Sequence, residues 1–472
     1  MSDALPTVDY LVIGAGAVGM AFVDTLIAED PDATVLIVDR HDVPGGHWND
    51  AYPFVRLHQP SAFYGVEGLE LGRGEIDRSG PNEGYYELAG CAEVLAYYER
   101  AMRKFIESGR VTFWPMTDYR GGGRCVGILS GEQRMVEAIK RVVDTTYFDT
   151  QVPATHTPRF EIEPGTRFMP TGELPNLVRD PDAVPSHFVV LGGGKTAMDT
   201  AGWLLGHDVA PERITWVRPR DSWMINRRFT QPGLEFFEGT IDFQSALMRA
   251  AIAADNVEGF FLELGKGGHM LRLDPDVQPT KFFFATISEG EVEALRAIDH
   301  VIRGSRVSRI APGLIEMEDG SHAVPDDSLF IDCTASAVAD KDSVPVFQDG
   351  KIVVQALFAP LVVFGAALTA WIEVHRDNDD ARNALAQPIA VKQGCAAYLT
   401  ATLGNLTNRM RWAREPNLAE WLGQSRLDPA ARTIAKVQAE RPELLGALGD
   451  YRTLAKQGVP ALMQLIQNAR ED

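Results

Sequence analysis

A glycine-rich segment near the start of the chain has the residue types and the spacing that bind a pyrophosphate. In YLVIGAGAVG, residues 10–19, Gly14, Gly16 and Gly19 form the pattern G-x-G-x-x-G. The first glycine permits a tight turn, the second admits a pyrophosphate, and the third lets a helix pack closely on a strand. Asp39, twenty residues further on, ends the next apolar stretch. A carboxylate there can accept hydrogen bonds from ribose hydroxyls and would repel a 2'-phosphate, so we expect a dinucleotide site.

A second segment with the same construction begins about 180 residues later. FVVLGGGKTAMD, residues 188–199, satisfies G-x-G-x-x-A with Gly192, Gly194 and, at the packing position, Ala197. Its letters GKT also match the end of a P-loop. Val189 stands where that motif requires its first glycine, so an ATPase phosphate cradle is excluded. The chain therefore has two turns for two dinucleotides.

Arginines take the place of the acid after the second turn. The stretch WVRPR contains Arg218 and Arg220 where an NAD site would have Asp or Glu. Guanidinium groups can bind the 2'-phosphate of NADP, which favours NADPH over NADH. Asp221 is the next residue, so a solvated strand end with an arginine paired to this carboxylate is the alternative. Lys195 lies either near the pyrophosphate or in solvent.

One site with ribose chemistry and one with phosphate chemistry indicate FAD in the first domain and NADPH in the second. Hydride transfer requires the two rings in contact, and a single chain fixes that geometry. Apolar runs and helical periodicity supply a strand, helix and strand around each turn. The expected fold is α/β, with two Rossmann-like dinucleotide-binding domains and a C-terminal helical segment. The expected boundaries are 1–165 and 325–376 for the FAD-binding domain, 166–324 for the NAD(P)H-binding domain and 377–472 for the helical segment.

Composition limits the partners. Lys and Arg number 45 against 65 Asp and Glu, and the net charge of -20 repels nucleic acids and anionic membrane surfaces. Four widely spaced cysteines form neither a redox pair nor a zinc-ligand cluster. The apolar stretch at 357–372 is shorter than the roughly 20 residues that span a bilayer. The first residues lack secretory-signal features, so we expect a cytoplasmic protein without nucleic-acid or membrane partners. A homodimer is one of several roles left open for the C-terminal helices.

The segment VPGGHWNDAYPFVRLHQPSAFYG, residues 43–65, resembles the GG-x-W region of flavin-dependent monooxygenases of the FMO, Baeyer-Villiger and N-hydroxylating group. The order of first turn, this segment, second turn and the strand IDCT extends the similarity over residues 8–375. The chain departs from the group at 166–187, where the usual F-x-G-x-x-x-H-x-x-x-W fingerprint is absent. No Gly-Asp pair follows KIVVQ, and Gln355 is expected to replace it. The matching residues are Gly45, Gly46, Trp48, Arg56, Pro60 and Ser61.

The resemblance implies an FAD- and NADPH-dependent monooxygenase. In that chemistry NADPH reduces FAD, oxygen adds at flavin C4a, and the resulting peroxide oxygenates a small organic substrate in a dry pocket. Because the fingerprint is missing, an NAD(P)H-dependent flavoprotein dehydrogenase or oxidase without oxygen insertion is the alternative. A flavoprotein scaffold with a vestigial site is a third reading.

The catalytic candidates are His47 and His58, whose imidazoles can donate or accept hydrogen bonds near neutral pH, although either could be structural. The resemblance also implies that a helix beginning near Phe364 or Gly365 directs its N-terminus at the flavin. No metal site is expected. The residues expected to bind cofactors are Gly14, Gly16, Gly19, Asp39, Arg40, Gly46, His47, Trp48, Arg56, Ser61, Gly192, Gly194, Lys195, Thr196, Arg218, Arg220, Thr334 and Gln355.

Overall fold

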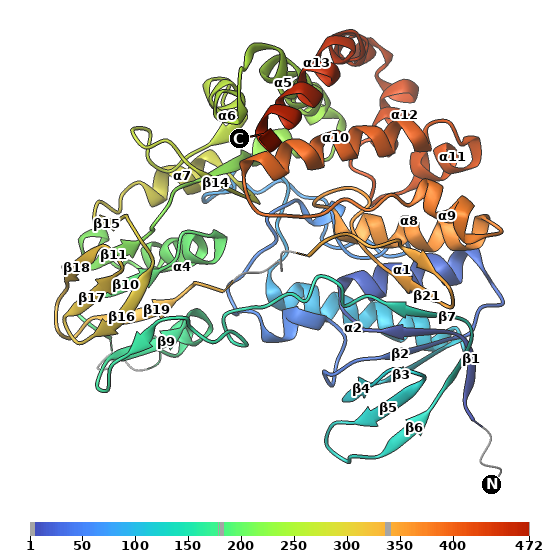
Figure 1. The fold of residues 1–472 in the computed structure, drawn as a ribbon, viewed down its shortest axis with the longest axis horizontal. Helices are drawn as coiled ribbons and strands as arrows, with labels where there is room; N and C mark the ends of the chain where they lie inside the picture. Colours follow the sequence, from blue (N-terminus) through green and yellow to red (C-terminus); the bar gives the residue numbers. More distant parts are fainter. Residues whose placement is uncertain (1–4, 178, 180–183, 336–340, 472) are drawn as a thin grey trace.

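Two sheet-based units and a helical region make up the molecule. The computed structural model describes residues 5–177, 179, 184–335 and 341–471. In Figure 1 one large sheet lies at the lower right, the second at the left, and the helices after residue 394 run across the top. The expected α/β fold with two dinucleotide-binding units is confirmed.

The first sheet is formed by buried apolar runs around the first turn. Its strand order is β20-β21-β7-β1-β2-β3, and helix α1 connects β1 to β2. Every residue of β2 is buried, as is typical of a parallel strand with both faces covered. The bounds are β1 Thr7–Ile13, α1 Ala17–Glu29, β2 Val35–Val38, β3 Val111–Trp114, β7 Glu137–Asp144, β20 Phe347–Gln348 and β21 Lys351–Val353.

The second sheet repeats this arrangement around the second turn, with the order β15-β11-β10-β19-β9. Strand β19, the IDCT stretch, pairs in parallel with β10 and β9. The expected boundary at residue 325 is therefore too early, because the chain returns to the first sheet only at β20. The bounds are β9 Arg167–Pro170, β10 Phe188–Leu191, α4 Lys195–Gly206, β11 Ile214–Val217, β15 Val301–Ile302 and β19 Leu329–Asp332.

Three small sheets and further helices complete the two units. A three-stranded sheet follows β3, a four-stranded sheet covers one face of the second sheet, and a third, of order β13-β12-β14, lies next to the helical region. The bounds are β4 Thr117–Tyr119, β5 Arg124–Gly127, β6 Gln133–Met135; β8 Glu161–Ile162, β16 Val307–Ala311, β17 Leu314–Met317, β18 Gly320–Ala323; β12 Ser222–Asn226, β13 Met270–Leu271, β14 Lys281–Ile287; and helices α2 Cys91–Glu107, α3 Leu174–Leu177, α7 Glu289–Leu295.

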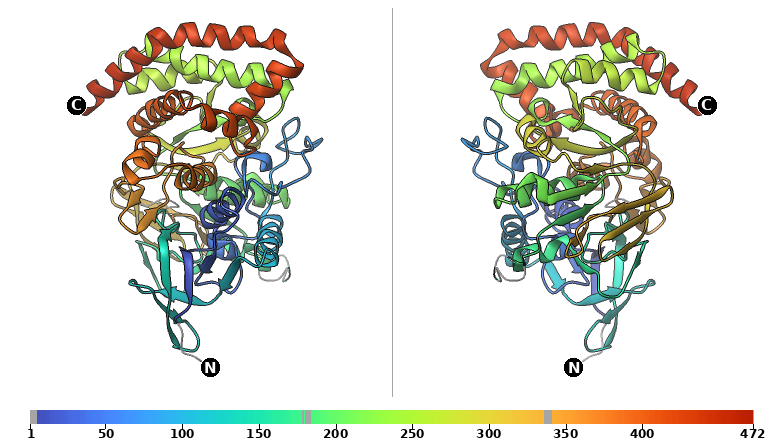
Figure 2. Two further views of the ribbon diagram at one scale, coloured as in Figure 1. Left: turned by 90° about the vertical axis from the view of Figure 1, so that its right-hand side faces the viewer. Right: turned by 90° about the vertical axis from the view of Figure 1, so that its left-hand side faces the viewer.

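The C-terminal helices pack on both units: α10 and α13 cover an insertion in the second unit, and α9 and α11 contact the first unit. One apolar cluster joins α5 and α6 to α10 and α13, and α13 runs along α5 (Figure 2). Residues of α10 and α13 therefore share a core with residues 237–266, whereas Leu385, Leu418 and Leu422 belong to the core of the first unit. The bounds are α5 Phe237–Ala253, α6 Val257–Lys266, α9 Asp379–Leu385, α10 Cys395–Trp412, α11 Pro416–Gln424, α12 Ala431–Glu440 and α13 Leu445–Glu471.

The apolar stretch at 357–372 becomes a buried helix of the first unit. Helix α8, Val362–His375, packs against α1, and all its residues from Val363 to Glu373 are buried. It begins two residues before the expected start at Phe364. In the part of the chain that the structure describes, no helix is both long enough and apolar enough to cross a membrane. The expected cytoplasmic location stays a prediction.

Candidate active site

One cavity of about 880 Å³ is lined by both sheet units and by the C-terminal region. The first unit contributes the segments 47–59 and 148–153, the second contributes 191–196, and residues 391–394 close one end. Ten of the expected site residues line this cavity. They are His47, Trp48, Arg56, His58, Gly192, Gly194, Lys195, Thr196, Arg220 and Thr334.

The second turn has the backbone of an anion site. Gly192 has φ of +130°, and a Cβ there would lie 2.6 Å from the carbonyl oxygen of Cys333. Gly194 is the N-cap of α4, no side chain caps it, and a Cβ on Gly194 would meet no atom within 4 Å. The first N–H groups of α4 therefore face open space, where a pyrophosphate can bind.

Lys195 lies beside this helix end but is already paired. Its ammonium forms ion pairs with Asp199, one turn along α4, and with Glu291 of α7, the latter at 3.2 Å. Burial acts to lower the pKa of Lys195, yet the two carboxylates outweigh it and raise that pKa. Tyr52 donates a hydrogen bond of 2.7 Å to Asp199. Asp199 therefore links Lys195 to Tyr52 of the first unit, and Lys195 does not point into solvent.

The two arginines after β11 have different surroundings. Arg218 is 4% exposed and lies 2.9 Å from Asp221, which Arg303 also contacts at 2.7 Å. The pairing with Asp221 agrees with the alternative, but the strand end is buried and not solvated. The expectation that Arg218 binds a phosphate is corrected, because its guanidinium is enclosed with this carboxylate. Arg220 is exposed, and its side chain lines the cavity. The second strand end thus offers one available guanidinium instead of two.

Other basic residues line the cavity and could bind a phosphate in place of the buried Arg218. Arg306 lies on the loop that meets the Arg220 loop, where the Gly304 N–H donates to the Pro219 carbonyl at 3.2 Å. Arg159 and Lys281 also line the cavity. Among the lining residues that the structure describes there are seven Lys and Arg and no Asp or Glu. In a chain of net charge -20, this carboxylate-free surface favours a polyanionic ligand.

The first turn is packed as tightly as the second, but its glycines do not line the cavity. Gly14 has φ of +103°, and a Cβ on Gly19 would lie 2.0 Å from the Gly14 carbonyl oxygen. Gly16 caps α1 without a side-chain contact, so the first N–H groups of α1 are available to an anion. A Cβ on Gly46 would lie 2.8 Å from the Cα of Gly16. This contact joins the first turn to His47, the next residue, which lines the cavity.

Asp39 lies at the end of β2, as expected, and has an unexpected partner. It is 7% exposed and accepts hydrogen bonds from the Ala15 N–H at 2.5 Å and from the His41 ring at 2.9 Å. The other ring nitrogen of His41 contacts Asp50 at 2.8 Å. The hydrogen bond to Asp39, reinforced by Asp50, raises the pKa of His41 to about 9. A protonated His41 therefore neutralises part of the negative charge of Asp39. Arg40, the residue between them, is exposed.

The two candidate catalytic histidines line the cavity as neutral imidazoles. Burial lowers the pKa of His47 to about 4. Burial, with a smaller effect of Lys195, lowers the pKa of His58 to about 4. His47 stacks on Trp48, whose indole N–H donates to the Tyr64 hydroxyl at 2.7 Å. This wall is apolar and internally hydrogen-bonded.

Two expected contacts are absent from the cavity. Ser61 is 1% exposed, and its hydroxyl bonds the backbone of Glu87 and Ala89. Gln355 is also 1% exposed, and its amide bonds both backbone groups of Val344. Both side chains hold loops together, so the expected cofactor contacts of Ser61 and Gln355 are corrected to structural roles.

Sequence reasoning missed several residues of the site. Arg159 and Arg306 are single charges in loops, and no local pattern marks them. His41 was detectable, because it follows Asp39 closely in the stretch DRHD. The aromatic pair Phe283 and Phe284 reads in the sequence as ordinary strand core.

The two turns, each after the first strand of a parallel sheet, define a protein with two Rossmann-type dinucleotide-binding domains. No family model matches the chain. The chain is 40% identical over 422 residues to the uncharacterized protein Rv2000 of Mycobacterium tuberculosis (strain H37Rv), covering 89% of this chain and 77% of that protein. The Mycobacterium bovis protein Mb2023 gives the same values. The chain belongs to the family of these mycobacterial proteins.

A more distant similarity links the chain to flavoenzymes. It is 25% identical over 232 residues to an FAD-dependent monooxygenase of Pyrenophora dematioidea, covering 44% of this chain and 39% of that protein. The resemblance to the flavin-dependent monooxygenases is thereby confirmed.

Solved structures similar to the chain include two monooxygenases. The flavin-containing monooxygenase of Stenotrophomonas maltophilia is 16% identical, with 78% of this chain and 98% of that chain covered and a TM-score of 0.42. Cyclohexanone monooxygenase from Rhodococcus sp. Phi1 bound to NADP+ is 16% identical, with 79% and 84% covered and a TM-score of 0.45. Because such TM-scores do not establish a common fold, the fold assignment rests on the strand order and the turns of this chain.

Proposed function

We propose that this protein is an FAD-dependent, NADPH-consuming monooxygenase that uses molecular oxygen to oxygenate a small organic substrate. The observation that carries the proposal is one carboxylate-free cavity, which one uncapped turn borders directly and the other reaches through the contact between Gly16 and Gly46. Such a cavity suits two dinucleotides whose reactive rings must meet. The resemblance of residues 43–65 supports the assignment of FAD to the first turn.

The residues of the first unit fit FAD. The N-terminus of α1 would bind the pyrophosphate. Asp39 would accept a hydrogen bond from a ribose hydroxyl, using carboxylate lone pairs that the hydrogen bonds from Ala15 and His41 do not occupy. The flavin, when bound, supplies the hydride-accepting and oxygen-activating chemistry. The FAD-binding unit would comprise residues 5–144 and 347–376, and residues 161–332 would form the NADPH-binding unit.

The residues of the second unit fit NADPH better than NADH. The pyrophosphate would bind above Gly194, where space is open, and the 2'-phosphate would contact Arg220 and Arg306 on their adjoining loops. A charge-assisted hydrogen bond contributes about 1.5–3 kcal/mol, enough for a ten- to hundredfold preference for the phosphorylated cofactor.

The other lining residues would keep water and stray protons away from the reacting atoms. Trp48 and Tyr64 satisfy each other's polar groups, so their rings present an apolar face. His47 and His58 are neutral above about pH 4, and each can donate or accept one hydrogen bond without adding charge. The N-terminus of α8, at Val362, lines the cavity and would stabilise negative charge nearby.

Reaction products test the proposal directly. Purified protein, reconstituted with FAD, is supplied with NADPH, a candidate substrate and oxygen labelled with 18O. Monooxygenation places one labelled atom in the product. Stoichiometric labelled hydrogen peroxide with every substrate tried would instead support a flavoprotein oxidase, and a protein that binds no flavin after reconstitution would overturn both assignments.

A further inference from the structure

His41 joins two carboxylates that lie on different segments of the first unit. Its ring nitrogens lie 2.9 Å from Asp39, just after β2, and 2.8 Å from Asp50, the last residue of the segment 46–50. We call these three side chains the imidazole bridge. Only an imidazolium donates from both nitrogens at once, because a neutral imidazole has one N–H and one acceptor nitrogen. The geometry therefore selects the charged form, in agreement with a pKa raised to about 9.

The two carboxylates do not depend equally on the His41 ring. Asp39 also accepts hydrogen bonds from the Ala15 N–H of the first turn at 2.5 Å and from the backbone N–H of His41 at 2.8 Å. Among the described residues, Asp50 has a side-chain hydrogen bond to the His41 ring alone. A neutral ring would keep its proton toward Asp39, whose side chain is 7% exposed against 36% for Asp50. Loss of the proton therefore releases Asp50.

The segment 46–50 is attached to the first turn at both of its ends. At its start, a Cβ on Gly46 would lie 2.8 Å from the Cα of Gly16. At its end, Asp50 reaches the turn through the imidazole bridge, because Asp39 accepts a hydrogen bond from that turn. Release of Asp50 would leave the segment held at one end only.

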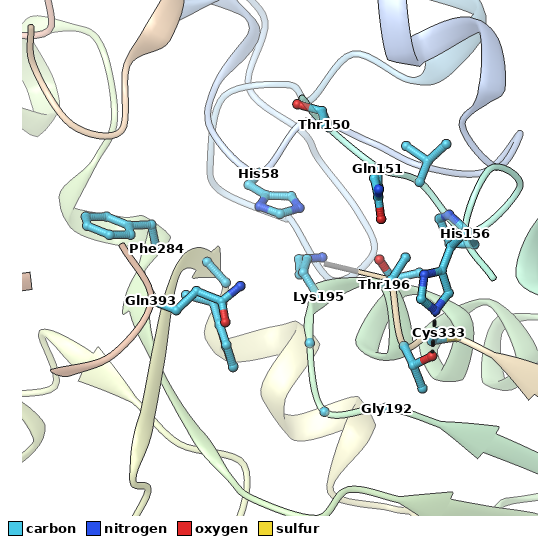
Figure 3. A pocket seen from close by; sticks show the side chains of 18 of the residues that line it. His58, Thr150, Gln151, His156, Gly192, Lys195, Thr196, Phe284, Cys333 and Gln393 are labelled. Atoms are coloured by element: carbon cyan, nitrogen blue, oxygen red, sulfur yellow. Dashed lines mark hydrogen bonds between the residues drawn. The ribbon is translucent and has the colours of Figure 1, made fainter. Parts of the chain in front are cut away.

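The residues between the two attachments form part of the cavity wall. His47 and Trp48 both line the cavity, and the wall continues from them along the segment 47–59. In Figure 3, His58 of this wall lies above Lys195 of the second turn. The imidazole bridge therefore fixes one end of the surface on which a dinucleotide bound to the first turn would pack.

The surroundings of His41 contain one further titratable ring. His47 senses the charge of His41, and burial keeps it neutral above about pH 4. Arg40 and Asp42, the neighbours of His41 in the chain, are exposed. From the loop after β3, the Met116 backbone N–H donates to the His41 carbonyl at 2.9 Å. Near pH 9 the imidazole bridge therefore changes its charge at His41.

We propose that His41 is a positioning residue of the first dinucleotide site: its imidazolium holds Asp39 and Asp50 together, and this bridge fixes the segment 46–50 beside the bound FAD. The inference rests on the proposed function, because it takes FAD as the occupant of the first turn. The charged form of His41 favours FAD binding, so the affinity is complete below about pH 9 and falls as the pH rises through that value. By reciprocity, bound FAD raises the pKa of His41 further.

The dissociation constant of FAD between pH 7.5 and 10 tests the bridge. Flavin fluorescence is measured while FAD is added to folded apoprotein, and any titration of the flavin itself cancels in the ratio between variants. His41→Lys keeps a cation between the carboxylates and serves as the reference. The wild type should match His41→Lys at pH 7.5 and bind FAD at least about tenfold more weakly than it at pH 10, because one charge-assisted hydrogen bond is lost. His41→Gln carries no charge and should bind about tenfold more weakly than His41→Lys at both pH values.

Asp50→Asn distinguishes positioning by charge from simple packing. The amide can still accept a hydrogen bond from the ring, but it no longer stabilises the imidazolium. The fall in FAD affinity should therefore move to lower pH by about one unit. This variant also carries the test if His41→Gln folds poorly.

His375 provides the matched control. It lies in the first unit, is 33% exposed against 30% for His41, and contacts the Glu29 carboxylate at 3.5 Å. His375→Gln should reproduce the wild-type pH profile. Equal FAD affinities for the wild type and His41→Gln at pH 7.5, or an unshifted profile in Asp50→Asn, would overturn the inference and leave the FAD site intact. Failure of every variant and of the wild type to bind FAD would overturn the proposed function, and the inference with it.

Discussion

At the scale of single residues, burial decides what a charge can do. Arg218 and Arg220 are two positions apart, yet one is enclosed with Asp221 and the other lines the cavity. The same principle applies to the histidines. His41 is flanked by two carboxylates and holds its proton, whereas burial removes the proton from His47 and His58.

The two arginines should respond differently to the same substitution. Arg218→Leu leaves Asp221 with one partner fewer in a buried site and should lower the free energy of unfolding by about 3 kcal/mol. Arg220→Leu should change stability by less than about 0.5 kcal/mol. It should weaken NADPH binding ten- to hundredfold and leave NADH binding nearly unchanged. Calorimetric unfolding and cofactor titration measure both effects. Equal NADPH affinities in wild type and Arg220→Leu would refute the phosphate contact.

The histidines predict a stability maximum near pH 6.5. Between about pH 4 and 6.5 the unfolded chain binds more protons at His47 and His58 than the folded chain does, so stability rises with pH. Between about pH 6.5 and 9 the folded chain holds the extra proton at His41, so that contribution is lost as pH rises. Urea unfolding across this range measures both limbs. His41→Asn should flatten the alkaline limb only; an unaltered alkaline limb would contradict the role of His41.

At the scale of elements, a close backbone contact joins the GG-x-W segment to the first turn. Gly46→Ala would force a Cβ against the Cα of Gly16 and require a left-handed alanine. Gly74 has a similar φ of +69°, but a Cβ there meets nothing within 4 Å. Gly74→Ala should therefore cost only the conformational penalty of about 1 kcal/mol.

The affinity for FAD should distinguish the Gly46→Ala variant from the Gly74→Ala variant. Gly46→Ala should displace the first turn and weaken FAD binding at least tenfold, because α1 and the 46–50 segment would no longer meet. Gly74→Ala should bind FAD as the wild type does. Flavin fluorescence during titration with FAD gives both dissociation constants. Tight binding by a folded Gly46→Ala protein would show that the contact is dispensable for the cofactor.

At the scale of the whole molecule, the C-terminal helices α10 and α13 share a core with the α5 and α6 insertion of the second unit, whereas α9 and α11 pack on the core of the first unit. Leu462 of α13 is fully buried in the cluster with α5 and α6, whereas its neighbour Met463 is 54% exposed. Leu462→Ala should lower the free energy of unfolding by about 3 kcal/mol, and Met463→Ala should have almost no effect. Chemical unfolding compares the two variants. Equal stabilities would mean that α13 is only loosely attached.

The sequence predicts those parts of the molecule that local patterns specify. The strand, turn and helix around Gly14 and Gly192 follow from glycine spacing and apolar runs. The pairing of β19 with the second sheet does not, because an apolar strand fits either sheet. The local sequence also does not specify where a side chain points. The burial of Arg218 and the hydrogen bonds of Gln355 to the Val344 backbone therefore could not be predicted. Residues brought together from distant loops, such as Arg159 and Arg306, have no common signal in the chain.

The packing of α13 along α5 also determines when the second unit can finish folding. Helix α5 ends at Ala253, and α13 begins only at Leu445. At about 5–20 residues per second, a ribosome needs roughly 10 to 40 s to synthesise the intervening chain. During that interval the apolar side chains of α5 and α6 that α13 covers in the native structure are exposed to solvent on the nascent chain. Chaperone capture during translation, and slow recovery of the native state after dilution from denaturant, are the behaviours to expect.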